Sequence, residues 1–175
     1  MTILRCTADL LKRLPPPSAP ESPSARLGDW HARIIFGKPR FVVLCTNDRS
    51  LLCVTVPLAP VRELVSRFVR AATHRIGQIP APDELLRAEV AALNPTRVGR
   101  SASRSVISTM NQFMYSAESW LTEQPLGDLE ELGFWLCDTP CTAISTHWPW
   151  LQAELLLTGA IATGCRPLNS PMHVL

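Results

Sequence analysis

Three arginines precede the best-marked helix of the sequence, in the stretch NPTRVGRSASRSVISTMNQFMYSAESW at residues 94–120. Arg97, Arg100 and Arg104 bring positive charge to the predicted N-terminus of this helix, where free backbone N–H groups already favour an anion. Arginine also donates bidentate hydrogen bonds to phosphate. The stretch therefore predicts a site for a phosphate-bearing ligand, with Ser105 and nearby backbone N–H groups assisting.

The residues that follow are spaced as on an amphipathic helix that begins at the N-cap Ser103. Its apolar stripe contains Val106, Ile107, Met110, Met114, Ala117 and Leu121. Its opposite face is polar with little charge, and its members are Arg104, Ser105, Ser108, Asn111, Gln112 and Tyr115. We expect Ser108 and Asn111 to add neutral hydrogen bonds to the predicted anion site.

A second basic row belongs to the helix predicted from Pro60 to about Ile76. Arg67, Arg70 and His74 are spaced at i, i+3 and i+7, which places them on one outer face. Such a row is usually a solvated face. The alternative is that Arg67 and Arg70 join the first arginines in one anion-attracting surface.

Residues for catalysis or metal binding are present without a recognisable motif. His31 or His74 could act as a base, but the sequence has no paired-carboxylate metal motif, no P-loop and no G-x-S-x-G segment. Cys137, Cys141 and His147 could suggest zinc, although no second pair at finger or ribbon spacing completes the site. We expect six unpaired cysteines, no structural metal and no cofactor; the cysteines are Cys6, Cys45, Cys53, Cys137, Cys141 and Cys165.

Charge is distributed unevenly along the 175 residues, although the net charge is only +2. Residues 1–104 hold 16 Lys/Arg and 8 Asp/Glu (+8), whereas residues 105–175 hold one Arg and 7 Asp/Glu (−6). Either the two halves neutralise each other, especially through Glu130 and Glu131, or the basic half binds a nucleic acid or another polyanion. The sequence has no membrane-spanning apolar run and no secretory signal, so we expect a cytoplasmic protein without membrane contact.

The elements predicted to position these residues form an α+β fold. Strands are expected at residues 2–6, 28–36, 40–46 and 51–57, with 96–101 as the candidate fifth, joined by hairpin-like connectors into an antiparallel sheet of four or five strands. Asp29, His31 and Arg33 alternate with apolar residues, which predicts a half-exposed strand. Four to five helices are expected to cover the sheet, mainly those beginning near residues 60, 82, 103 and 128.

The predicted domain extends over residues 1–141, with the proline-rich loop 15–24 as an insertion. Residues 142–175 are expected to form a partly helical extension with a frayed tail. Its Trp148-Pro149-Trp150 segment is either an exposed anchor for a protein partner or an ordinary core-filling segment.

Five segments together resemble an uncharacterised family of small bacterial proteins, a domain-of-unknown-function family from plasmid and other accessory-gene contexts. These segments are TILRCTADLLKRL, LGDWHARIIF, VVLCTNDRSLLCVTVP, RSVISTMNQF and LCDTPC, within residues 1–141. The resemblance implies no activity. It marks Asn47 and Arg49 as motif residues of unknown role, beside Arg104, Ser105, Ser108 and Asn111.

Three functional classes stay open. The first is a protein that binds a nucleic acid or another phosphate-bearing partner. The second is a small phosphodiesterase or nuclease, and the third is a protein–protein interaction module, such as an inhibitor or antitoxin-like partner of a mobile element. The arginines favour binding over catalysis.

Overall fold

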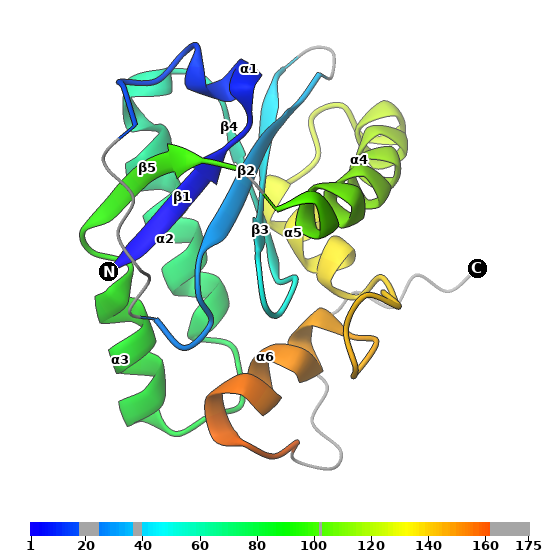
Figure 1. Cartoon of the computed structure of the whole chain (residues 1–175). Helices are drawn as coiled ribbons and strands as arrows, with labels where there is room; N and C mark the ends of the chain where they lie inside the picture. The colour runs from blue at the N-terminus through cyan, green and yellow to red at the C-terminus, as the bar shows by residue number, and fades with distance from the viewer. Residues whose placement is uncertain (18–24, 37–39, 102, 162–175) are drawn as a thin grey trace.

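A five-stranded sheet organises the computed structural model, which describes residues 1–17, 25–36, 40–101 and 103–161 (Figure 1). The strands lie in the order β4-β3-β2-β1-β5. Their bounds are β1 Thr2–Cys6, β2 Trp30–Ile35, β3 Val42–Asn47, β4 Cys53–Pro57 and β5 Thr96–Arg100. Each lies where the sequence predicted a strand, including the last one.

The prediction of an antiparallel sheet was wrong for one half of it. Strands β2, β3 and β4 are antiparallel neighbours, as their short connectors indicated, but β1 is parallel to both β2 and β5. Residues 7–29 join β1 to β2. This connection is long enough for the chain to run back to the end of the sheet where β1 begins, so that β2 can run parallel to β1. The helices between β4 and β5 provide a second crossover. The sheet is therefore mixed.

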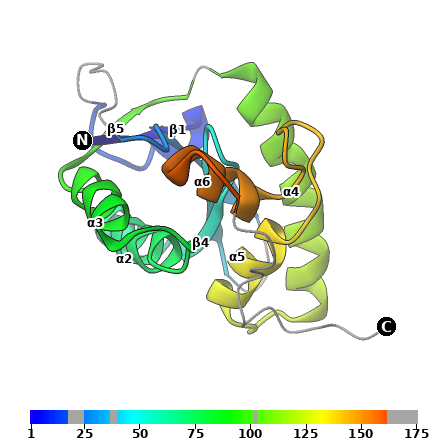
Figure 2. The same cartoon turned by 90° about the horizontal axis from the view of Figure 1, so that it is seen from below.

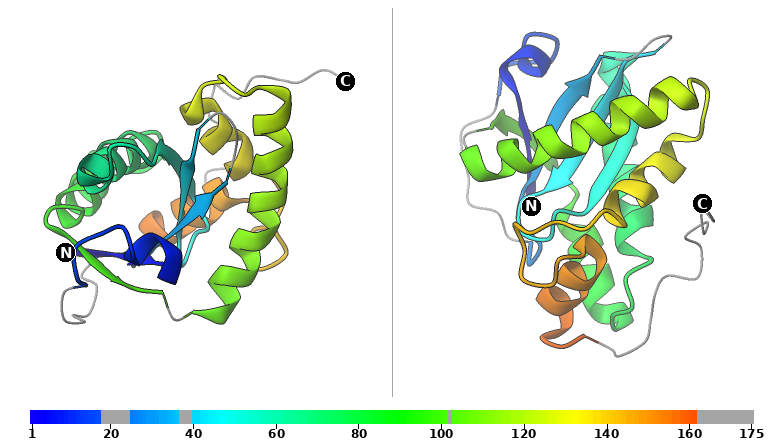
Figure 3. Two further views of the ribbon diagram at one scale, coloured as in Figure 1. Left: turned by 90° about the horizontal axis from the view of Figure 1, so that it is seen from above. Right: turned by 90° about the vertical axis from the view of Figure 1, so that its right-hand side faces the viewer.

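Helices cover both faces of the sheet. Helix α2 (Leu64–Ile76) packs against β4 and against α3 (Asp83–Ala92), while α4 (Arg104–Glu123) crosses β2 and β3 on the opposite face (Figure 3). The remaining helices are α1 (Ala8–Leu11), the short 3-10 helix η1 (Val61–Glu63), α5 (Leu129–Cys137) and α6 (Pro149–Thr158).

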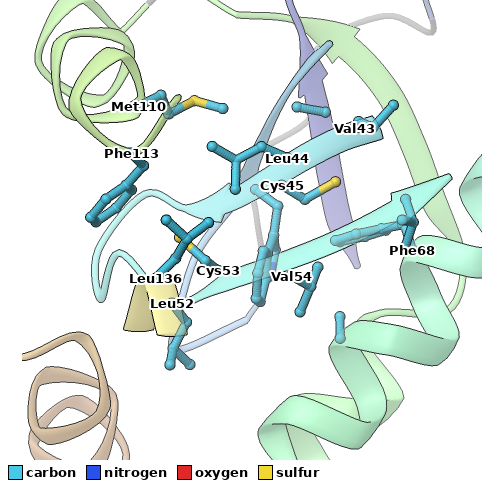
Figure 4. Packing of buried hydrophobic residues seen from close by; sticks show 14 of the residues in the cluster. Val43, Leu44, Cys45, Leu52, Cys53, Val54, Phe68, Met110, Phe113 and Leu136 are labelled. Atoms are coloured by element: carbon cyan, nitrogen blue, oxygen red, sulfur yellow. The ribbon is translucent and has the colours of Figure 1, made fainter. Parts of the chain in front are cut away.

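Alternation along the strands divides the core between the two faces. Leu44 of β3 points toward Met110 and Phe113 of α4, whereas Val54 of β4 lies on the side of Phe68 in α2 (Figure 4). Trp30 of β2 meets Phe68 edge-on, with the ring centroids 5.5 Å apart. Both layers of helix thus pack against apolar residues of the sheet, which presents such residues on both of its faces.

The open edge of β4 is covered by α5. The Cys53 N–H donates to Cys137 Sγ at 3.0 Å, and Thr55 Oγ1 donates to the Leu129 carbonyl. These contacts occupy polar groups of an edge strand that would otherwise be free to pair with another chain.

Helix α6 adds to the same core from the region predicted as an extension. Trp150, Ala153 and Leu157 are buried in the hydrophobic cluster, and Trp150 stacks on Phe134 of α5 with centroids 5.8 Å apart. Trp150 is therefore a core residue, as in the core-filling alternative, and not an exposed anchor. Most of the proline-rich loop, Cys165 and the predicted frayed tail lie outside the described residues. None of the helices in the described ranges combines the length and apolar character that a membrane crossing needs.

Candidate functional site at the β5–α4 corner

The predicted anion site lies where β5 leads into α4, and we name it the β5–α4 corner, defined as Arg97, Arg100, Ser101, Arg104 and Ser105. Strand β5 forms one edge of the sheet and pairs only with β1 among the described strands. Arg97 and Arg100 are three residues apart on this strand, so their side chains leave opposite faces of the sheet. Both are exposed. The corner therefore has basic groups on both faces of the sheet edge rather than three arginines converging on one point.

The start of α4 has the cap that the sequence predicted. Ser103 Oγ accepts from the Val106 N–H at 3.5 Å and lies 3.2 Å from Ser105 Oγ. Arg104, Ser105 and Ser108 are exposed. Neither Arg100 nor Arg104 forms an ion pair within the part of the chain that the structure describes. Their charges are thus available to an external partner.

A row of polar side chains runs across the sheet beneath this corner. Gly99, Arg5, His31 and Thr46 are cross-strand neighbours in register on β5, β1, β2 and β3, so their α-carbons share one face of the sheet. His31 Nδ1 lies 2.7 Å from Ser101 Oγ, which ties β2 to the end of β5.

A buried carboxylate completes this row. Asp29 Oδ2 lies 2.6 Å from Arg5 Nε, and its Oδ1 accepts from the Ile3 N–H at 3.1 Å. Asp29 is only 2% exposed and so is His31. The prediction of a half-exposed strand was therefore wrong for most of β2, because Asp29 and His31 are buried and hydrogen-bonded, and of the three alternating polar residues only Arg33 is partly exposed.

Burial shifts the titration of two groups near this row. Desolvation, with a further contribution from the Arg5 charge, lowers the pKa of His31 from 6.5 to about 4, and Asp29 opposes the shift. Desolvation and the Asp29 charge raise the pKa of Asp48 from 3.8 to about 6, against the opposing effects of Arg49, the Asp29 N–H and Arg5. At neutral pH His31 is a neutral imidazole. Its low basicity argues against the role of general base that the sequence left open for it, since a catalytic base works best with a pKa near the operating pH.

Asn111 of α4 reaches back to the sheet. Arg33 Nη1 donates to Asn111 Oδ1, which attaches the exposed face of α4 to β2. Arg104, Ser108, Asn111 and Tyr115 follow one another at i, i+4, i+7 and i+11, so they form one stripe on α4. Tyr115 is 75% exposed, which leaves its ring open along the helix.

The motif residues Asn47 and Arg49 form the β3–β4 turn. Asn47 Oδ1 accepts from the N–H groups of Arg49 and Ser50, at 3.1 and 2.9 Å, and from Ser50 Oγ at 2.8 Å. Arg49 is exposed and donates through Nη1 to the Arg26 carbonyl at 3.0 Å. In this turn Asn47 satisfies backbone donors, as asparagine commonly does.

The second basic row is not continuous with the corner. Arg67 and Arg70 lie on α2, which packs against β4, and β4 is the sheet edge opposite β5. Four inter-strand steps separate these edges, roughly 19 Å between backbones. Arg67 is also occupied, since it pairs with Glu63 at 2.8 Å and donates to the Ala59 carbonyl at 2.7 Å. The structure thus brings together the residues near α4 and leaves the α2 row apart.

The candidate metal-binding residues Cys137 and Cys141 lie at the end of α5 and just after it, and α5 packs against β4, the sheet edge opposite β5. The five described cysteines are free and buried, and no group of His, Cys, Asp and Glu within the described residues could hold a metal ion. His74, the other candidate base, lies 2.7 Å from Glu130 Oε1 through its Nε2. Glu130 therefore has a partner on α2, at the far edge of the sheet from Arg100 and Arg104.

Sequence reasoning missed Ser101, Arg5 and Asp29. Ser101 falls between a predicted strand and a predicted helix, and only the register of β1, β2 and β5 brings it to His31. Arg5 and Asp29 carried a signal, because both are charged residues in short β-rich segments, but pairing between them depends on β1 and β2 being parallel neighbours.

Comparison with protein families gives one match. The model described as a domain of unknown function (DUF6933) matches residues 3–151, which include the whole corner and part of α6. Neither the curated proteins nor the solved structures gave a match to this chain.

Proposed function

The chain belongs to the DUF6933 family of unknown function, and on that premise we propose from its geometry that it binds a nucleic acid or another phosphate-bearing polyanion at the β5–α4 corner. The observation that carries the proposal is the pair Arg100 and Arg104. Both side chains are exposed, and neither has an acidic partner among the described residues. They flank the start of a 20-residue helix whose first-turn N–H groups favour an anion.

The energy available from such contacts is sufficient for weak binding. An exposed anion gains roughly 0.3–1 kcal/mol from the helix dipole. Each hydrogen bond between charged groups adds about 1.5–3 kcal/mol. Hydrogen bonds from Arg100, Arg104 and the Ser105 hydroxyl would together contribute more binding free energy than the helix dipole alone.

The arrangement of charges also supports an external partner over internal neutralisation. The sequence left open that the corner arginines pair with Glu130 and Glu131. Both acids lie on α5, which covers β4, and Glu130 pairs with His74 there. The width of the sheet separates these acids from β5.

The stripe on α4 supports a single-stranded nucleic acid as the ligand. The stripe from Arg104 to Tyr115 covers 12 residues of helix, whose 11 steps span roughly 16 Å. It begins with an arginine and ends with an exposed aromatic ring. A cation that contacts the backbone and an aromatic platform for a base are the usual parts of sequence-tolerant single-strand binding.

The test is the affinity of the intact chain for a labelled single-stranded oligonucleotide, measured by fluorescence anisotropy. We expect the double variant Arg100→Ala/Arg104→Ala to bind more weakly while its melting temperature is unchanged. Arg70→Ala is the matched control, because Arg70 is an exposed arginine on α2 without an ion pair among the described residues. A double variant that melts at a lower temperature and binds as well as the original would show that these arginines are structural.

A further inference from the structure

Two buried thiols meet where α5 covers the edge strand β4. Helix α5 lies alongside β4 in the view from below (Figure 2), and Cys137 is its last residue. Cys137 Sγ accepts from the Cys53 N–H at 3.0 Å and donates to the Cys53 carbonyl at 3.4 Å. The side chains of the two residues also share a hydrogen bond. The two cysteines are therefore in direct contact, although they lie 84 positions apart in the sequence.

This contact places the two residues within reach of a disulfide bond. A sulfur atom that lies beside both the N and the O of Cys53 is close to the Cα of that residue. This position keeps the two Cα atoms within the span, below about 7 Å, that a disulfide bridges. Gly133, one helical turn before Cys137, contributes to the approach, since a Cβ there would lie only 3.5 Å from the Cys53 carbonyl oxygen. The backbone of the folded protein therefore already suits a bond between these residues.

The other cysteines of the sheet are not paired in this way. Cys6 and Cys45 are both in register with Ala32, one on each side, so two inter-strand steps of roughly 9.5 Å in total separate them. Cys53 is in register with Thr46, the residue after Cys45. The side chains of Cys45 and Cys53 therefore leave opposite faces of the sheet.

The surroundings of the pair favour Cys137 as the thiol that reacts first. Desolvation opposes the ionisation of Cys137, but its hydrogen bonds with Cys53 and the charge of Arg75 lower its pKa below the usual 9.0. Desolvation and the neighbouring Cys137 raise the pKa of Cys53. Arg75 is a buried residue of α2, and its Nη2 lies 2.9 Å from the position of a Cβ on Gly133, so its charge is close to this part of α5. Because the thiolate is the nucleophilic form, Cys137 is the nucleophile and Cys53 the second thiol.

We propose that Cys53 and Cys137 form a peroxide-sensitive site, at which hydrogen peroxide oxidises the two thiols to one disulfide. Cys137 attacks one peroxide oxygen, the O–O bond breaks, and Cys137 becomes a sulfenic acid while one water molecule leaves. The Cys53 thiol then attacks the Cys137 sulfur, the S–O bond breaks, and the hydroxyl group leaves with the Cys53 proton as a second water molecule. Both thiols are thereby oxidised and the peroxide is reduced.

The position of Cys137 in α5 gives the oxidant a route to a buried sulfur atom. Cys137 ends its helix, and helix ends open locally more readily than the strands of a core. Once formed, the disulfide fixes the last turn of α5 to the edge strand β4. The site goes beyond the proposed nucleic-acid binding and does not depend on it, because β4 and the β5–α4 corner lie at opposite edges of the sheet.

The test treats the folded, reduced chain with hydrogen peroxide, removes the peroxide, denatures the chain and counts its free thiols. Cys165, which lies outside the described residues, is changed to serine in every chain so that its thiol does not enter the count. The count should fall from five to three, and dithiothreitol should restore it to five. Cys141→Ser is the matched control, because Cys141 is also buried and lies four residues after Cys137. Its count should likewise fall by two.

Tryptic mapping of the oxidised Cys141→Ser chain identifies the bond without a change at either reacting residue. The fragment of residues 50–62 contains Cys53, and the fragment of residues 105–175 then contains Cys137 as its remaining cysteine, so a disulfide should join these two fragments. In Cys53→Ser the Cys137 sulfenic acid has no second thiol to react with and should be trapped by dimedone. A count that stays at five, or a disulfide between other fragments, would show that this pair is not a peroxide-sensitive site. A dimedone adduct on Cys53 in Cys137→Ser, with none on Cys137 in Cys53→Ser, would contradict the assignment of Cys137 as the nucleophile.

Discussion

Two side chains, His31 and Asp48, resist ionisation in the folded protein, with opposite effects on its pH stability. His31 stays neutral down to pH about 4, whereas the unfolded chain takes up this proton below pH 6.5. Its contribution to stability is complete above pH 6.5 and is lost as the pH falls to 4. Asp48 takes up a proton below pH about 6 in the folded state and below 3.8 when unfolded, so folding gains as the pH falls through that range.

These opposing effects predict a flat pH profile for the original chain and sloping profiles for two variants. Between its folded and unfolded pKa values, each group changes the free energy of unfolding by about 3 kcal/mol. Asp48→Asn retains only the pH dependence of His31, so this variant should lose stability as the pH falls from 6.5 to 4. His31→Gln retains only the pH dependence of Asp48, so this variant should gain stability over the same interval. Urea unfolding at a series of pH values measures both.

Gln112→Ala is the control for this experiment, because Gln112 is exposed on α4 and its side chain does not titrate. Its profile should match that of the original chain. Parallel profiles for the original chain, His31→Gln and Asp48→Asn would contradict the assignment of a buried neutral imidazole and a buried protonatable carboxyl.

Some of these residues could be found from the sequence and others could not. Arg100, Arg104 and Ser103 are local features of one helix start, and the structure places them there. The alternation of Asp29, His31 and Arg33 is the same whether this face of the strand is exposed to solvent or buried. The sequence shows which residues are polar, but it does not show whether another element packs over them. Only the approach of α4 and the register with β1 decide between these two cases.

At the level of elements, the close contact of α5 with the edge strand β4 depends on Gly133, which has no side chain. A Cβ on Gly133 would lie 2.9 Å from Arg75 Nη2 and 3.5 Å from both the Cys53 carbonyl oxygen and the Thr55 nitrogen. Arg75 has little room to move because it is buried against Phe134. Helix α5 can therefore lie directly on the strand at this point.

Gly133→Ala should lower the free energy of unfolding by about 1–3 kcal/mol, because the added methyl group overpacks this contact. This loss opposes the helix propensity, which by itself favours alanine by about 1 kcal/mol. Gly77→Ala is the matched control, since its φ is −62° and its Cβ would approach nothing closer than 3.4 Å. Urea unfolding should show Gly77→Ala unchanged or stabilised by up to about 1 kcal/mol. Equal effects of the two changes would contradict the close α5–β4 contact.

The polar stripe of α4 makes a separate prediction about the ligand. If a nucleic-acid base stacks on Tyr115, Tyr115→Ala should weaken oligonucleotide binding by about 1–3 kcal/mol, or about 5- to 150-fold in Kd. Binding to heparin, which has no bases, should be unchanged. Anisotropy with labelled oligonucleotide and competition by heparin give both values. An equal loss for both ligands would point to a polyanion site without base stacking.

The elements themselves were largely predictable, whereas their pairing was predictable only where connectors are short. Residue types and lengths between β2, β3 and β4 demand hairpins, and these strands are antiparallel. In its described part, the connection between β1 and β2 has a short helix, Ala8–Leu11, and the sequence between the two strands includes the proline-rich stretch 15–24. Nothing local in such a connection determines whether the next strand returns parallel or antiparallel, so this half of the sheet was assigned wrongly.

At the scale of the whole molecule, the basic and acidic halves of the sequence neutralise each other only in part. Glu130 of the acidic half pairs with His74 of the basic half, whereas the described ion pairs of Asp29 and Glu63 are with Arg5 and Arg67, within the basic half itself. The exposed Arg100 and Arg104 lie at the other sheet edge from α5, without an ion pair in the described ranges. The small net charge thus coexists with a local basic corner, which the sequence could suggest but not locate.

The most direct test of this account is the salt dependence of oligonucleotide binding, measured as the slope of log Kd against log salt concentration. Each phosphate contact on a single strand contributes about 0.7 to this slope. Removing Arg100 and Arg104 should therefore reduce its magnitude by about 1.4, while Arg70→Ala leaves the slope of the original chain. An unchanged slope in the folded double variant would contradict the proposal that the β5–α4 corner contacts phosphate.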